Sequence, residues 1–132
     1  MIVDTSVLAA IAFGEDESKA FLERIATGAP AISAATLVES EIVVRGRRGE
    51  AALHGLRALV AKTAMTIVPF DEHHAQIASE AYARYGRGSG HPAKLNYGDC
   101  FSYALAIARD EPLLFKGDDF VHTDVRSAAA EA

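Results

Sequence analysis

The sequence predicts an α/β domain in which a short parallel sheet is flanked by helices on both faces. Short apolar runs of strand length alternate along the chain with helical segments. No tight turn joins two strand-like runs, as an antiparallel hairpin would require. The chain has 132 residues, 50% of them hydrophobic and 23% charged, which suits one domain with a real core. We therefore expect residues 1–132 to form a single domain.

The first half of the chain contains two of the predicted strands. In order, its elements are a strand at 1–4, helices at 6–13 and 18–26, a strand at 31–33, and helices at 36–48 and 50–62. Gly14 ends the first helix, and Gly28 and Pro30 end the second, because both residue types interrupt helical backbone. Gly49 separates the last two helices, which predicts a helical hairpin.

The second half repeats the alternation of strand and helix. Its predicted elements are a strand at 65–68, a helix at 71–85, a glycine-rich loop at 86–98, a helix at 99–109, a buried strand at 113–115 and a short last strand at 121–125. Pro69 ends the first of these strands, and Pro112 stops the last helix. An Ala-rich tail follows Ser127.

Acidic residues stand where such elements begin or end. Asp4 ends the first strand, Glu39 lies early in a helix, Asp99 opens another helix, and Asp118 and Asp119 follow the last apolar run. In a parallel α/β domain these places meet at one edge of the sheet. Carboxylates gathered there repel one another unless a hard cation joins them, and Mg²⁺ and Mn²⁺ prefer oxygen ligands. The pattern predicts a site for a divalent metal ion.

Each acid also has a structural interpretation. Asp4 and Asp99 stand where an acid caps a helix or interacts favourably with its dipole. Thr36 and Glu39 match a capping box, and the acid pair at 118–119 follows a glycine as in an ordinary turn. The metal site is favoured by the set, since one fold brings all four places together.

The charge distribution is typical of a metal-dependent enzyme that acts on a polyanion, with chance surface charge as the alternative. The net charge is −5, yet residues 42–98 hold eight Lys and Arg against four acids. Thr5 and Ser6 are expected to orient Asp4 or to bind a water of the metal. Six cations are candidates for holding phosphates, with a solvated surface as the alternative for each: Arg45, Arg47, Arg48, Arg84, Arg87 and Lys94.

Other chemistries fit poorly. The adjacent His73 and His74 lack ligand spacing, and there is no Cys-x-x-Cys, nucleophile elbow or phosphate-binding loop. Cys100 is expected to be a buried thiol, consistent with a reducing compartment. The start of the chain lacks a basic region, and no apolar stretch reaches the ~18 residues of a membrane span. We expect a soluble, cytoplasmic protein without a membrane partner.

Four segments carry a resemblance to a known family. They are Met1-Ile2-Val3-Asp4-Thr5-Ser6, the stretch Ser33 to Glu39, the stretch Leu95 to Ala106 with its Asn-Tyr-Gly-Asp, and the stretch Leu113 to Phe120. In this order, and over nearly the whole chain, they resemble PIN-domain ribonucleases, specifically the VapC toxins of VapBC toxin–antitoxin modules.

The resemblance implies a Rossmann-like PIN fold and an endoribonuclease, dependent on Mg²⁺ or Mn²⁺, that hydrolyses RNA phosphodiester bonds. It implies that Asp4, Glu39 and Asp99 are catalytic acids, with Asp4 and Asp99 as direct metal ligands. The fourth acid falls at Asp118 or Asp119, and the alignment leaves the choice open. The family further implies a homodimer and a cognate VapB-type antitoxin whose tail occupies the active-site groove.

Two other functions remain open from the residues. A phosphoacceptor receiver domain also places acids at strand ends and needs a late lysine, for which Lys116 qualifies, but Asp4 lacks the acidic neighbour that a receiver requires. A module that binds RNA or a protein without cutting is the second alternative. The identity of the RNA, its cleavage sequence and the number of metal ions stay undetermined by the sequence.

Overall fold

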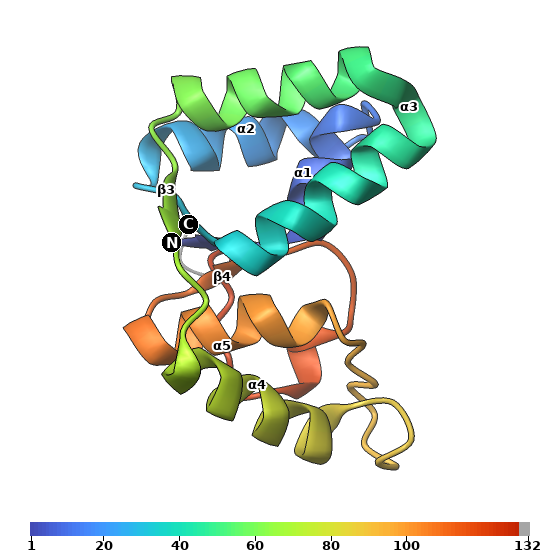
Figure 1. Cartoon of the computed structure of the whole chain (residues 1–132), viewed down its shortest axis with the longest axis vertical. Helices are drawn as coiled ribbons and strands as arrows, with labels where there is room; N and C mark the ends of the chain where they lie inside the picture. Colours follow the sequence, from blue (N-terminus) through green and yellow to red (C-terminus); the bar gives the residue numbers. More distant parts are fainter. Residues whose placement is uncertain (130–132) are drawn as a thin grey trace.

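A four-stranded parallel sheet lies between two layers of helices in the computed structural model, which describes residues 1–129 (Figure 1). The strands are β1 (Ile2–Val3), β2 (Ala31–Ser33), β3 (Thr66–Val68) and β4 (Leu113–Leu114). Their order across the sheet is β3-β2-β1-β4, and β1 pairs in parallel with both β2 and β4. The predicted α/β class is confirmed. Residues 130–132 of the Ala-rich tail lie outside the described residues.

Helices cover both faces of the sheet. They are α1 (Thr5–Ala12), α2 (Ser18–Thr27), α3 (Ala34–Lys62), α4 (Glu72–Tyr85) and α5 (Asp99–Arg109), with a 3₁₀ turn, η1, at Phe120–His122. In Figure 1, α1, α2 and α3 lie on one side of the sheet and α4 and α5 on the other. Successive strand residues point to opposite faces. Val3 and Leu114 accordingly join the core under α1–α3, whereas Ile2 and Leu113 join the core under α4 and α5.

A break at Gly49 divides α3 into two arms, seen as the sharp turn of that helix in Figure 1. Gly49 has a φ of +83°, a conformation that residues with a Cβ rarely adopt. Across the arms, Arg57 Nη2 lies 2.9 Å from Glu41 Oε1. The predicted hairpin around Gly49 is confirmed.

The predicted last strand at 121–125 is wrong. Phe120 to His122 instead form the 3₁₀ turn, and Thr123 holds the backbone after it: its hydroxyl donates to Phe120 O (2.8 Å) and accepts from Val125 N (3.3 Å). This local bonding competes with pairing to the sheet. The chain returns to the side of β4 a few residues further on, where Ser127 pairs with Leu113 in an isolated bridge.

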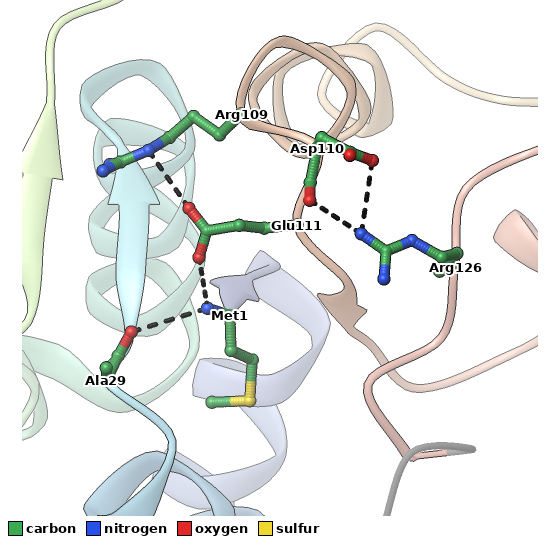
Figure 2. Close-up of polar contacts among 6 residues, drawn as sticks. All are labelled: Met1, Ala29, Arg109, Asp110, Glu111 and Arg126. Carbon is green, nitrogen blue, oxygen red and sulfur yellow. Dashed lines mark hydrogen bonds and ion pairs between the residues drawn. The ribbon is translucent and has the colours of Figure 1, made fainter.

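Polar contacts fasten the start of β1 to the segment before β4 (Figure 2). The Met1 α-amino nitrogen lies 2.6 Å from Glu111 Oε1, and Arg109 Nε lies 3.1 Å from Glu111 Oε2. Beside them, Arg126 Nη2 lies 3.3 Å from Asp110 Oδ1. These contacts help to hold β1 and β4 in register at the edge opposite to the acids. Within residues 1–129, none of the helices has the length and apolar character needed to cross a membrane.

Candidate active site

Acidic side chains from four segments gather at the carboxyl edge of the sheet. Asp4 directly follows β1, Glu39 lies in the second turn of the helix that follows β2, Asp99 is the first residue of α5, and Asp119 lies just beyond β4. Asp4 is 3% exposed and Asp99 is 9% exposed. Burying an ionised carboxylate is costly unless partners compensate it. The environment of each acid therefore decides what this edge can do.

Asp4 is held by three hydrogen bonds from side chain and backbone. Its Oδ2 accepts from Ser6 N (3.0 Å) and Ser6 Oγ (2.7 Å), and its Oδ1 accepts from Ser102 Oγ (2.5 Å). The Ser6 hydroxyl also accepts from Lys116 N at 2.9 Å, which ties Asp4 to the end of β4. Asp4 thus does cap α1, and the same bonds fix the orientation of its carboxylate.

Glu39 is held by a neighbouring threonine. Thr5 Oγ1 donates to Glu39 Oε1 over 2.6 Å, while Glu39 Oε2 lies against the backbone of Gly98. Burial raises the pKa of Glu39, the nearby charge of Asp4 raises it further, and the hydrogen bond from Thr5 opposes both. Glu39 is therefore a carboxyl group that lacks enough positive charge around it.

The capping-box interpretation of Glu39 is wrong. Helix α3 begins two residues earlier than predicted, and its cap is Ser33, whose Oγ accepts from Ala35 N at 3.2 Å. Thr36 consequently lies inside the helix, with its hydroxyl 3.2 Å from Ser102 Oγ. Glu39 therefore does not cap α3, and its carboxylate accepts the hydrogen bond from Thr5 instead.

Asp99 has the most perturbed environment of the four. Its Oδ2 accepts from Asn96 N (2.9 Å), and Asn96 Oδ1 accepts from Asp99 N (2.8 Å). Burial is the main cause that raises the pKa of Asp99 to about 7, with the charges of Asp4 and Asp119 adding to it and the Asn96 amide opposing it. Near neutral pH this site thus holds too much negative charge for its surroundings.

The structure places Asp119, and not Asp118, beside Asp99. Asp119 acts on the Asp99 carboxyl both by its charge and by a hydrogen bond between the two side chains. Both side chains are exposed, but Asp119 raises the pKa of Asp99, whereas Asp118 is not among the causes of that shift. Adjacent side chains diverge from the backbone, so only one of the two faces the other acids.

Three of the predicted phosphate-binding cations lie at the turn of the α3 hairpin. Arg45 Nε lies 2.8 Å from Glu50 Oε1 across the break. The guanidinium carbons of Arg47 and Arg48 lie 4.2 Å and 5.4 Å from the centre of the Phe13 ring. Cation–π contacts of this kind position the side chains without neutralising their charge.

The other three cations lie around the glycine-rich loop. The guanidinium carbon of Arg84 stands 4.8 Å from the centre of the Tyr85 ring. Arg87 and Lys94 line a cleft of about 770 Å³ whose wall also includes Asp119. A shared cavity thus joins this last pair to the acidic edge.

Sequence reasoning missed three residues that shape the site, namely Asn96, Gly98 and Ser102. Ser102 lies three positions after Asp99, so helical spacing alone puts both on one face of α5. That spacing is a signal in the sequence. The reciprocal bonds between Asn96 and Asp99 likewise span three residues, as in a capping box, whereas the close approach of Gly98 to Glu39 has no local pattern.

The chemistry of the acids suits a hard divalent cation, although their spacing is not that of a preformed site. All the donors are oxygens, which Mg²⁺ and Mn²⁺ prefer, and the raised pKa values of Glu39 and Asp99 mark uncompensated charge. Over residues 1–129, no three His, Cys, Asp or Glu side chains stand close enough together to hold a metal ion. An ion held there by one or two carboxylates would complete its coordination with water, as Mg²⁺ usually does.

Comparisons with known proteins agree with this fold. The family model of the PIN domain matches residues 1–126. Ribonuclease VapC28 of Mycobacterium tuberculosis is 46% identical over 129 residues, covering 97% of both chains. Ribonuclease VapC42 of the same organism is 42% identical over 129 residues, which is 97% of this chain and 98% of that one.

A solved structure has the same fold. The crystal structure of Mycobacterium tuberculosis VapC20, described as a Sarcin-Ricin loop cleaving toxin, superposes with a TM-score of 0.77 at 19% identity, covering 94% of this chain and 95% of the other. The fold and the family model together define a PIN-domain protein, and this chain belongs to the PIN-domain family. Its relatives place it among the VapC ribonucleases, toxins of toxin–antitoxin modules with endoribonuclease activity.

The receiver-domain alternative has lost its support. Its lysine, Lys116, directs Nζ to Glu15 Oε1 (3.3 Å) and Glu17 Oε2 (3.1 Å) rather than to the buried acids. The family membership also favours cleavage over binding alone, since the relatives are ribonucleases.

Proposed function

We propose that this chain hydrolyses RNA phosphodiester bonds with Mg²⁺, or Mn²⁺ in its place, held by Asp4 and Asp99 and completed by Glu39 and Asp119. The observation that carries the proposal is the Asp99 carboxyl group, buried beside two further acids with its pKa raised to about 7. A divalent cation is the group that would make this collection of carboxylates stable at neutral pH.

The residues of the chain divide the work between them. Ser6 and Ser102 fix the carboxylate of Asp4 so that it presents oxygen to the cation. Thr5 donates a hydrogen bond to Oε1 of Glu39. Oε2 of Glu39 lies beside Gly98 and is available to orient a water. A bound ion would supply a water of lowered pKa and a positive charge that offsets the charge of the phosphate under attack. We expect products with 5′-phosphate and 3′-hydroxyl ends.

The test is cleavage of RNA by purified wild type, Asp4→Asn and Asp99→Asn proteins, with Mg²⁺, with Mn²⁺ and with EDTA. Wild type is expected to cleave only with a divalent ion, and each variant to lose at least about a hundredfold in rate. Mapping cleavage ends in RNA from cells that express the chain identifies the substrate. Undiminished cleavage by Asp99→Asn, or cleavage in EDTA, would reject the proposed site.

We further propose that the chain works in the cytoplasm, is a homodimer, and is inhibited by a VapB-type antitoxin. Val38 and Ile42, one helical turn apart on α3, are 59% and 62% exposed. Large apolar side chains adjacent on a helix support a protein interface on that face. Light scattering after size exclusion should give a dimer for wild type and a smaller species for a Val38→Asp, Ile42→Asp double variant.

A further inference from the structure

The glycine-rich loop between α4 and α5 is a bonded structure rather than a loose connection. Its two ends pair through Arg87 N to Leu95 O (3.0 Å) and Leu95 N to Tyr85 O (2.9 Å). Inside it, Ser89 Oγ donates to Gly86 O at 2.6 Å. These bonds give the side chains of the loop fixed starting positions.

His91 is oriented within this loop by two contacts. Its Nδ1 accepts from Ala93 N at 3.1 Å, and its ring packs edge-on against Tyr85 with 4.8 Å between ring centres. A neutral imidazole whose Nδ1 accepts must carry its proton on Nε2. His91 therefore offers an N–H donor, and its side chain lines the cleft.

Two cations complete the same cleft. Arg87 and Lys94 are exposed, and neither forms an ion pair with any residue in the range 1–129. Lys94 also has a φ of +51°, in the left-handed region that residues with a Cβ rarely adopt. The loop thus holds three N–H-bearing side chains at one cavity, and the two cations among them have no ion-pair partner within residues 1–129.

The cleft opens beside the acidic edge. Asp119 lines it and also contacts Asp99, so one residue belongs to both places. The cleft has a volume of about 770 Å³, within the ~300–1,000 Å³ range of sites that bind small ligands, which is enough for part of a nucleotide. A strand of RNA whose phosphate is at the acids would place a neighbouring phosphate within reach of these cations.

We propose that Arg87, His91 and Lys94 form a subsite for a backbone phosphate next to the one that is cleaved. The inference rests on the proposed RNA hydrolysis and adds to it a positioning role for the loop. A contact made equally before and during the reaction lowers KM and leaves kcat nearly unchanged. The subsite should thus act on the charge of the RNA backbone and not on the identity of a base.

The experiment pairs a change in the protein with a change in the RNA. The substrate is a short oligoribonucleotide that contains a mapped cleavage site, with each flanking phosphate in turn replaced by an uncharged methylphosphonate. Wild type, Arg87→Gln and Lys94→Gln are compared by kcat and KM. Lys62→Gln, which removes an equal charge from the end of α3, is the matched control. Thermal unfolding checks that every variant is folded.

At one flanking position, the neutral linkage is expected to raise KM for wild type about tenfold, the effect of losing one charged contact. Arg87→Gln and Lys94→Gln should raise KM similarly on the natural linkage and lose little more on the neutral one. Lys62→Gln should behave as wild type. The subsite would be overturned if the increases in KM caused by the protein variant and by the neutral linkage were additive, or if the variants kept the wild-type KM. An effect of the variants on antitoxin binding alone would also overturn it. Wild type that cleaves no RNA would instead reject the proposed function on which the subsite depends.

Discussion

The carboxylate of Glu39 packs so closely against Gly98 that a Cβ at position 98 would stand 1.8 Å from Oε2. This contact joins the second turn of α3 to the residue just before α5. It places Glu39 against the residue that precedes Asp99 and leaves no room for a side chain there. The glycine at this position therefore allows Glu39 to approach the start of α5.

Replacing Gly98 with Ala should damage activity far more than stability. The Glu39 side chain is flexible and can swing away from the new methyl group, so we expect the free energy of unfolding to fall by less than about 1 kcal/mol. The displaced carboxylate should lower kcat by at least about tenfold, because small misplacements of reacting groups are costly. Steady-state kinetics and urea unfolding measure the two effects.

Gly55→Ala is the matched control for that substitution. Gly55 lies inside α3 with nothing within 4 Å of a Cβ built there. Alanine should stabilise this helix by up to about 1 kcal/mol and leave the rate unchanged. Normal activity in Gly98→Ala would show that the position of Glu39 is not critical for cleavage.

Asp99→Asn should make the metal-free protein more stable at high pH while it abolishes cleavage. The pKa of Asp99 is raised in the folded chain, so the folded state resists its ionisation. Wild type should thus lose stability as the pH rises from about 4 to above 7, and the variant should not lose it. We expect the variant to be more stable by about 2 kcal/mol at pH 8 and nearly equal to wild type at pH 4.

Urea unfolding in EDTA across this pH range is the measurement. Asp16→Asn, at an exposed acid between α1 and α2, serves as the control and should follow wild type at every pH. A stability difference that does not change with pH would contradict the raised pKa of Asp99.

Divalent ions should stabilise the folded wild type. A ligand that binds only the folded state at a hundred times its Kd adds about 2.7 kcal/mol, which raises Tm by several degrees for a domain of this size. Thermal scans with and without Mg²⁺ at about 10 mM should show this rise for wild type. Asp4→Asn should show none, and an equal rise in that variant would place the ion elsewhere.

Thr5→Val should alter the pH dependence of cleavage. Thr5 donates to Glu39 over 2.6 Å and thereby opposes the causes that raise the pKa of Glu39. Without this hydroxyl, the pKa of Glu39 should rise further, and the acidic limb of the profile of kcat/KM should move to higher pH. Stability should fall by about 1 kcal/mol for the lost hydrogen bond. Thr5→Ser keeps the hydroxyl and should restore the profile.

The two neighbouring acids after β4 should differ in importance. Asp119 raises the pKa of Asp99 and lines the cleft, whereas Asp118 does neither, although both side chains are exposed. Asp119→Asn should lower kcat/KM by about tenfold or more, and Asp118→Asn should change it less than twofold. Cleavage assays on both variants decide this, and the reverse order would assign the fourth acid to Asp118.

Local features of the sequence determined the order of strands and helices, the break at Gly49 and the placement of Asp4, Glu39 and Asp99 at element ends. These features depend on neighbouring residues along the chain, such as apolar periodicity and the backbone freedom of glycine. The fold class followed, because alternating strands and helices pack in few ways.

Only the tertiary structure decided which local bond wins when several compete. Glu39 matched a capping box, yet Ser33 caps α3 and Glu39 bonds to Thr5, 34 residues away. It likewise brought Asp119 beside Asp99 and the cations of the glycine-rich loop beside Asp119. Such outcomes depend on contacts between distant segments, whose energies are as large as those of local caps and turns and have no signature within any one segment.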